Sequence, residues 1–359
     1  MMISSLKKLY FMKLSLLDIA KQLNVSTAAV SRALNDLPGV GDELRLQVKE
    51  TAARLGYVKH LRVAVGGRPE RAKQLIVVLF GPIGGNLVGE LDVGIDEILR
   101  RKGYYELRYL VDTLRLHRTE AGKEAFLLKT ITETSVAGIL SCYVPLSDVI
   151  ISKMYKHNVP VVLIENQTEF GRCVTTNNVK ASHKAVTKLI ELGRRHIGCI
   201  MPPEDADHVW YDRLSGYRRA LKEKAYPYDP SLIVYENFVS IKSGGLATRA
   251  LLQQNPKLDA ILYGSDTMAC GGMKMLRDLG KKVPDEIAVI GFDDEDFDSV
   301  LQPTLSSIRQ PLRKMAEVGL GLLFDSIDKG DYSHRHIEME TELLLRGSCL
   351  KDYDGETWA

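Results

Sequence analysis

From residue 75 onward the chain alternates short apolar runs with longer amphipathic stretches. The apolar runs are five to seven residues long and cover 75–80, 105–111, 136–142, 159–165, 196–201, 232–236, 259–264 and 287–292. Runs of this length predict buried strands, and the stretches of about 12–16 residues between most of them have the apolar spacing of helices. This alternation predicts parallel sheets with helices on both faces.

The number of these units predicts two lobes. Eight or nine β–α steps are more than one open sheet of usual size holds. We predict a two-lobed α/β domain over 73–347, with about 73–175 plus 305–328 in the first lobe and about 176–304 plus 329–347 in the second. The tail, 348–359, has no heptads, so we expect no terminal coiled coil.

Residues 14–57 predict three helices instead of a further β–α unit. The segment LSLLDIAKQL places its apolar residues on one helical face. Ser26 is an N-cap candidate for a second helix that runs to about Leu34, and Gly41 or Asp42 caps a third. Two short helices joined by a tight turn and supported by a third predict a helix-turn-helix.

The second of these helices has mostly small side chains, which lets its backbone approach a major groove about 12 Å wide. The residues expected to pack inward are Val25, Val30 and Leu34. The residues left facing outward are Thr27, Ala28, Ser31 and Arg32. Such side chains hydrogen-bond bases or phosphates, or touch a thymine methyl group. The alternative is a small packing helix without a partner.

The charge distribution is compatible with DNA binding. The formal net charge is +2, yet residues 1–72 hold 12 Lys and Arg against 6 Asp and Glu. That region therefore carries +6 and the remainder −4. A basic piece on an acidic body fits a nucleic-acid contact at one end, although a solvated basic face gives the same pattern.

We expect a cytoplasmic, nucleoid-associated protein with no membrane partner. The N-terminal stretch imitates a signal peptide, but Lys13 interrupts its apolar run and Asp18 follows it. We interpret residues 1–13 as an extension, with translation starting at Met1 or Met12. No run reaches the roughly 18–20 apolar residues of a bilayer span. Five scattered cysteines without a C-x-x-C motif fit a reducing compartment.

The sequence has no recognisable motif for catalysis or cofactor binding. The eight histidines show no metal-binding spacing, and there is no G-x-S-x-G elbow. The segment GPIGGNLVG (81–89) is rich in glycine but lacks the spacings of phosphate-binding loops, so we interpret it as a loop that opens a ligand cleft. We expect no enzymatic activity, no cofactor and no metal.

Polar residues follow several predicted strands, at the edge where parallel sheets bind ligands. They are Asn86, Glu165, Ser265, Asp266, Asp293, Asp294 and Gln310. Carboxylates accept paired hydrogen bonds from hydroxyls, Arg213 donates several, and Trp210 or Phe238 offers an apolar face to a ring. Each residue alone fits a helix cap or a surface group better than a ligand contact. Together they favour a hydroxyl-rich ligand such as a sugar.

Six segments, spread over nearly all of residues 14–347, resemble the LacI/GalR family of bacterial transcription regulators. They are LLDIAKQLNVSTAAVSRALN, RLQVKETAARLGY, ELGRRHIGCI, RLSGYRRAL, YGSDTMACGGMKMLRDLGKKVPDEIAVIGFDD and PTLSSIRQP. The resemblance implies an all-α, lambda-repressor-like helix-turn-helix, a hinge, and a core like that of periplasmic sugar-binding proteins. It also implies a homodimer on palindromic double-stranded operator DNA.

The resemblance implies site residues as well. Thr27 and Ala28 match the main base-reading pair, with Ser31 and Arg32 beside them. Further DNA contacts are expected from Leu16, Ser26, Asn35 and Tyr57. Arg213 and Asp293 match the effector-binding arginine and aspartate. Other pocket positions are matched by Glu165, Ser265, Gln310, Phe238 or Val239, and, in the first lobe's loop, Asn86, Leu87 and Val88.

The hinge, residues 58–72, departs from the family. The family follows GY with x-Pro-Asn and ends its hinge helix on an apolar wedge for the minor groove. This chain has Lys59 and His60 at those positions and Gly66 near the wedge, which leaves Leu61 or Val65 as the substitute. We therefore expect residues 24–36 to contribute more of the DNA sequence recognition than the same helix does in other regulators of this family.

The predicted function is a DNA-binding regulator, with repression as the expected mode, whose operator affinity is controlled by a sugar-like ligand between the lobes. The alternative from another class is a sugar-binding protein without a DNA partner. An enzyme ranks third, because the predicted cleft shows no catalytic constellation.

Overall fold

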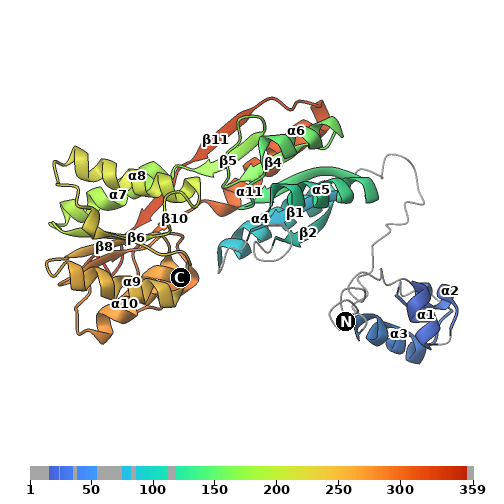
Figure 1. Cartoon of the computed structure of the whole chain (residues 1–359), viewed down its shortest axis with the longest axis horizontal. Coiled ribbons are helices and arrows are strands. Elements are labelled where there is room, and N and C mark those ends of the chain that lie inside the picture. The colour runs from blue at the N-terminus through green and yellow to red at the C-terminus, as the bar shows by residue number, and fades with distance from the viewer. Residues whose placement is uncertain are drawn as a thin grey trace, which may run out of the picture. The chain divides into compact units, whose positions relative to one another are not determined.

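The computed structural model describes residues 16–23, 25–34, 39–54, 75–81, 86–111 and 119–353. The chain divides into two compact units, residues 1–67 and 68–359 (Figure 1). The described part of the first unit is helical, and the second unit holds two lobes, each built on a parallel sheet. The predicted fold class is therefore confirmed.

The first unit contains helices α1 (Leu16–Leu23), α2 (Thr27–Leu34) and α3 (Asp42–Arg54). Ser26 caps α2, as predicted, because its Oγ accepts a hydrogen bond from the Ala29 amide at 3.1 Å. A small apolar core joins the three helices. Its buried members are Ile19, Ala20, Val30, Ala33 and Val48.

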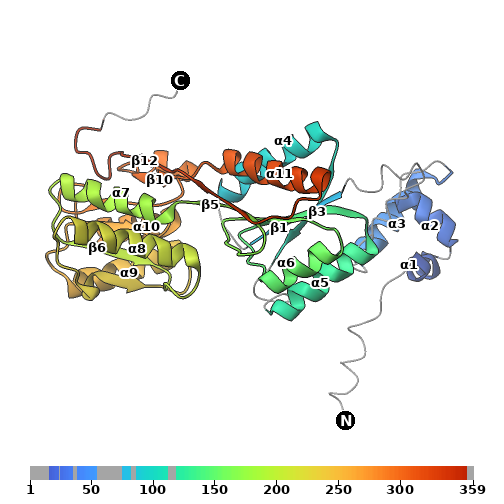
Figure 2. The ribbon, with the colours of Figure 1, turned by 90° about the horizontal axis from the view of Figure 1, so that it is seen from above.

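The first lobe is a six-stranded parallel sheet in the order β11-β5-β4-β3-β1-β2. Its strands are β1 (Leu75–Phe80), β2 (Tyr105–Leu110), β3 (Val136–Cys142), β4 (Val161–Ile164), β5 (Arg172–Thr176) and β11 (Arg335–Met339). One face is covered by α4 (Asn86–Lys102) and α11 (Leu312–Lys329), the other by α5 (Glu120–Glu133) and α6 (Asp148–Lys156) (Figure 2). Both faces are buried, which is why the central strands are continuously apolar.

The second lobe is a four-stranded parallel sheet in the order β7-β6-β8-β9. Its strands are β6 (Ile197–Met201), β7 (Ile233–Tyr235), β8 (Ala260–Tyr263) and β9 (Ala288–Ile290). One face is covered by α7 (Asn178–Glu191) and α8 (His208–Glu223), the other by α9 (Ile241–Gln254) and α10 (Asp266–Asp278). Single 3₁₀ turns lie at Pro230–Leu232 and Asp296–Ser299.

Two C-terminal strands, β11 and β10 (Ser307–Arg309), belong to the opposite lobe from the one predicted. The prediction places 329–347 in the second lobe, but β11 pairs with β5 at the edge of the first sheet. It places 305–328 in the first lobe, but β10 pairs with β12 (Glu342–Leu344), and Ile308 packs in the second lobe's core. A strand edge needs a partner for its amides and carbonyls, and the polar segment RHIEM gives no indication of which sheet supplies it.

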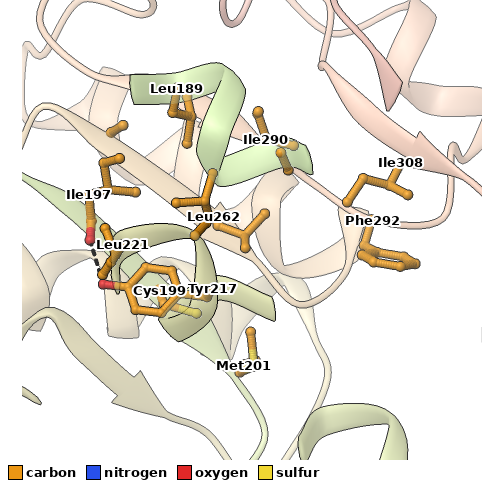
Figure 3. Packing of buried hydrophobic residues seen from close by; sticks show 14 of the residues in the cluster. Leu189, Ile197, Cys199, Met201, Tyr217, Leu221, Leu262, Ile290, Phe292 and Ile308 are labelled. Carbon is orange, nitrogen blue, oxygen red and sulfur yellow. Dashed lines mark hydrogen bonds between the residues drawn. The ribbon is translucent and has the colours of Figure 1, made fainter. Parts of the chain in front are cut away.

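Helix α8, which carries Arg213, packs with α7 against the second sheet. Figure 3 shows buried residues of this core, among them Tyr217 and Leu221. Tyr217 of α8 is fully buried, and its hydroxyl donates to the Ile197 carbonyl at 2.8 Å. The helix is therefore fixed to β6 one turn after Arg213. Among the described helices, none combines the length and the hydropathy needed to cross a membrane.

Helices α9 and α10 pack so closely that glycine is required at one contact. A Cβ on Gly271 of α10 would lie 1.8 Å from the carbonyl oxygen of Ile241 in α9. We expect Gly271→Ala to lower the free energy of unfolding by roughly 1–3 kcal/mol or more, because backbone atoms must move apart. Gly321 of α11 is the control, since a Cβ there meets nothing within 4 Å. Gly321→Ala should stabilise by about 1 kcal/mol, and denaturant titrations of both variants would measure the contrast. Equal effects would contradict the packing argument.

Candidate functional site

Helix α2 has the two faces that the sequence predicts. Thr27, Ala28 and Arg32 are exposed, whereas Val30 and Ala33 are fully buried against the other two helices. The exposed face of α2 thus offers a hydroxyl group, a methyl group and a guanidinium, and two of its three side chains, Thr27 and Ala28, are small. This is a surface through which a helix backbone can come close to a partner.

Several predicted contact residues lie outside the described part of the chain. For DNA these are the side chains of Leu16 and Ser31, together with Asn35, Tyr57 and the hinge at 58–72. For the ligand they are the side chains of Asn86, Leu87 and Val88, in the first turn of α4. Those assignments remain predictions.

Arg213 of α8 is the centre of a buried polar cluster. Its side chain is 4% exposed and lies 3.8 Å from Asp293 Oδ1, measured from Nη2. It donates through Nε to Asn178 Oδ1 at 2.9 Å and through Nη1 to the Gly264 carbonyl at 2.5 Å. The guanidinium also stacks on Phe292, with 3.4 Å between Cζ and the ring centroid. These contacts fix the orientation of the guanidinium.

The first lobe contributes Glu165, the residue directly after β4. Its carboxylate is buried and accepts hydrogen bonds from the Thr176 amide at 2.6 Å and from Asn178 Nδ2 at 3.5 Å. Its φ of +55° lies in the left-handed region and turns the chain at the end of the strand. Since Asn178 donates to Glu165 and accepts from Arg213, it joins the two lobes' charged groups.

The second lobe contributes Asp293, which follows β9. Its Oδ1 accepts a hydrogen bond from Gln310 Nε2 at 2.7 Å, and its amide donates to the Ile308 carbonyl at 2.9 Å. Its φ of +117° is unusual for a residue with a Cβ, and such outliers concentrate at functional sites. Hydrogen bonds also fix the loop that carries Asp293. Ser307 Oγ donates to buried Asp266 at 2.8 Å and accepts from the Asp294 amide at 3.0 Å.

Burial dominates the electrostatics of this cluster. Desolvation raises the pKa of Glu165, although hydrogen bonds from Thr176 and the charge of Arg213 oppose it. Desolvation likewise raises the pKa of Asp293 well above its ordinary value, against Arg213. Desolvation lowers the pKa of Arg213, which the two carboxylates counteract. One guanidinium, which stays protonated in proteins, therefore lies with two carboxylates in a place where charge is costly.

Besides Thr176 Oγ1, four polar atoms of this region are buried and have no hydrogen-bond partner among the described residues. They are Tyr143 Oη, Asn166 Nδ2, His208 Nε2 and Gln310 Oε1. Tyr143 follows β3 at φ +58° and interacts electrostatically with Glu165, Asp293 and Arg213. Buried polar atoms are nearly always paired, so these atoms suit a polar ligand or ordered water. The sequence prediction missed Tyr143, Asn166 and His208.

The structure also places two further predicted pocket residues, whose contact with a ligand stays a prediction. Ser265 caps α10, because its Oγ accepts from the Met268 amide at 3.3 Å. Phe238 is 74% exposed and Val239 45%, in the segment before α9. Trp210, the other predicted aromatic residue, does lie beside the cluster, with its ring centroid 5.1 Å from Arg213 Cζ. Helical spacing explains this, since Trp210 and Arg213 are one turn apart on α8.

Metal ligands do not gather anywhere in the described ranges, where no three His, Cys, Asp or Glu side chains form a group that could hold an ion. The five cysteines are free thiols. The polar cluster is thus built from a guanidinium, carboxylates and amides, which recognise hydroxyl and amide groups through hydrogen bonds.

Comparison with known proteins places both units. Residues 15–60 match the family described as bacterial regulatory proteins, lacI family, and residues 186–349 match the periplasmic binding protein-like domain. The transcriptional repressor CytR of Escherichia coli (strain K12) is 30% identical over 339 residues, 92% of this chain and 95% of that protein. The transcriptional regulator RegA of Clostridium saccharobutylicum is 28% identical over 341 residues, which are 94% of this chain and 100% of that protein.

A solved structure is similar as well. The cellobiose complex of the transcriptional regulator CelR has a TM-score of 0.69 and 26% identity, and the match covers 93% of this chain and 99% of that one. The chain belongs to the LacI family of bacterial transcriptional regulators.

Proposed function

We propose that this regulator is a repressor that binds palindromic operator DNA as a homodimer in the cytoplasm, and that a small polar ligand between the lobes controls its operator affinity. The main support for the ligand site is that residues of both lobes meet in the polar cluster around Arg213. Glu165 comes from the first lobe, Arg213 and Asp293 from the second, and Asn178 connects them. The ligand class is a sugar or sugar derivative, in keeping with the cellobiose in the CelR complex.

A ligand held by groups from both lobes favours one lobe arrangement over others. In a dimer, two recognition helices must reach successive major grooves about 34–36 Å apart, so lobe arrangement and operator affinity are coupled. The coupling is reciprocal: operator DNA changes ligand affinity by the same factor. Measuring ligand affinity with and without operator therefore tests the coupling from the ligand's side.

The basic test is DNA selection with the full chain. Duplexes selected from a randomised palindromic library should bind with an affinity that scrambled duplexes do not reach, and added salt should weaken binding steeply. Fluorescence anisotropy gives both affinities. A protein that binds sugars but shows no preference among duplexes would be a sugar-binding protein without a DNA partner, and the proposal would be wrong.

Arg32 tests the recognition helix. Arg32→Ala should weaken operator binding by about 1–3 kcal/mol and relax preference at one base pair, if the guanidinium reads a guanine. Arg32→Lys is the matched control, since it keeps the charge but loses the two-pronged geometry. If lysine restores full affinity and preference, Arg32 contacts a phosphate and not a base. Unchanged binding in both variants would remove Arg32 from the interface.

A further inference from the structure

His208 lies at the start of α8, beside the cluster. Its Nδ1 is 2.6 Å from Asp207 Oδ1, and Asp207 also caps α8 by accepting from the Val209 amide at 3.2 Å. The short contact assigns the Nδ1 proton to the hydrogen bond with Asp207. Nε2, buried and without a hydrogen-bond partner among the described residues, is left for a ligand atom.

Carboxylates outnumber cations around this position. His208 interacts with Asp207, Glu165 and Asp212, while Asp293 lies with Arg213 deeper in the site. Burial lowers the pKa of His208, but Asp207 and the other carboxylates outweigh it, so the pKa is raised overall. Four carboxyl groups thus lie against two cations, Arg213 and His208. The burial that raises the pKa of Glu165 and Asp293 makes additional negative charge costly there.

The charge of Arg213 is already shared with a protein carboxylate. Its guanidinium lies 3.8 Å from Asp293 and donates two of its five N–H groups, one to Asn178 and one to the Gly264 carbonyl. A phosphate or carboxylate on the ligand would compete with Asp293 for this guanidinium and would lie among like charges, which is unfavourable where water is excluded.

The atoms left for the ligand include both donors and acceptors. Asn166 Nδ2 donates, Gln310 Oε1 accepts, and Tyr143 Oη does either. A hydroxyl group also does either, so a molecule with several hydroxyls satisfies all of these atoms without bringing charge.

We infer that the ligand is an uncharged, polyhydroxylated molecule, that the acidic surplus excludes phosphorylated and carboxylated sugars, and that His208, oriented by Asp207, is a specificity-determining residue that contacts a ligand oxygen through Nε2. The inference rests on the proposed function in that this cluster is the effector site. It goes further by fixing the ligand's charge class.

The test is a binding screen of the full chain with matched pairs that differ in one charge-bearing group. The pairs are cellobiose with cellobionate, glucose with glucose 6-phosphate and ribose with ribose 5-phosphate, extended to a library of neutral sugars and nucleosides with their acids and phosphates. Neutral members should raise the melting temperature, as ligands of the folded state do, and their charged partners should not. A charged member that stabilises as strongly as its neutral partner, or a library without a neutral binder, overturns the inference.

The two proposals fail in different ways. If a charged member binds and shifts operator affinity, the regulator function stands and the charge assignment is wrong. If a neutral member binds but its binding is unaffected in Arg213→Lys and Asp293→Asn, the effector site lies elsewhere and both are wrong.

Asp207→Asn separates charge from structure, since asparagine caps a helix as well as aspartate does. The variant should reduce the preference for the neutral member of a pair by about fivefold, the effect of one partly exposed charge. NMR titration should show the pKa of His208 falling at the same time. The matched control is Glu204→Gln, which removes a carboxylate paired with Arg218 on the same lobe, and its preference should not change. Equal preference in Asp207→Asn and in the unaltered protein would contradict the role of Asp207 and His208.

Discussion

Asp293→Ala is expected to abolish the response of DNA binding to ligand while the ligand-free protein keeps its operator affinity. Asp293 Oδ1 accepts from Gln310 and lies 3.8 Å from Arg213, so its carboxylate is held ready for hydroxyl groups. A hydrogen bond between a charged group and a neutral one contributes about 1.5–3 kcal/mol, so its loss should weaken ligand binding ~10-fold or more. Operator titrations with and without ligand measure both parts of the prediction.

Asp278→Ala is the control for this change. Asp278 ends α10, is exposed, and pairs with Lys274, so its removal changes the net charge equally without touching the cluster. Its ligand response should match that of the unaltered protein. A variant at Asp293 that still releases or gains DNA with ligand would exclude this residue from the effector site.

The sequence predicts the central strands well because both faces of a parallel sheet are buried, and a short continuous apolar run such as LIVVLF is typical of a strand in that position. It fails for β5 and β11, whose segments RCVTT and RHIEM are polar. In β5, Arg172 is fully buried. It donates to the carbonyls of Leu322 and Ser333 and pairs with Asp331, contacts about 150–160 residues distant in sequence that no local pattern shows.

The site shows the same limit. Polar residues after strands predicted that Glu165 and Asp293 lie together, because the carboxyl ends of parallel strands are where such sheets bind ligands. The structure brings both carboxyl groups to Arg213, and their contact with a ligand stays a prediction. Tyr143 follows β3 in the same way, but an aromatic residue after an apolar strand suggests core packing, and its positive φ is not visible in the sequence. Ser265 meets the same rule and caps α10. The sequence does not distinguish a strand-end hydroxyl that faces a ligand from one that faces only its own helix.

Arg213→Ala is expected to be strongly destabilising, and more so at high pH than at low pH. Removing one partner of a buried charged cluster typically costs about 3–5 kcal/mol, because the remaining charges stay buried without compensation. Here those charges are Glu165 and Asp293, whose pKa values burial already raises in the folded protein. The loss of Arg213 must raise them further, since the guanidinium lowers both.

The sign of the pH dependence follows from linkage. A carboxyl group whose folded pKa lies above its unfolded value binds its proton more tightly in the folded state, so acid favours folding and the benefit is lost as pH rises through the folded pKa. The variant should therefore lose least stability near pH 5 and most near pH 8, as urea titrations at both values would measure. Adding Asp293→Asn to Arg213→Ala should recover part of the loss at high pH, because it removes one uncompensated charge and keeps the side chain's shape. A loss that is equal at both pH values, or that Asp293→Asn deepens, would mean that Arg213 stabilises this site through packing on Phe292 and not through its charge.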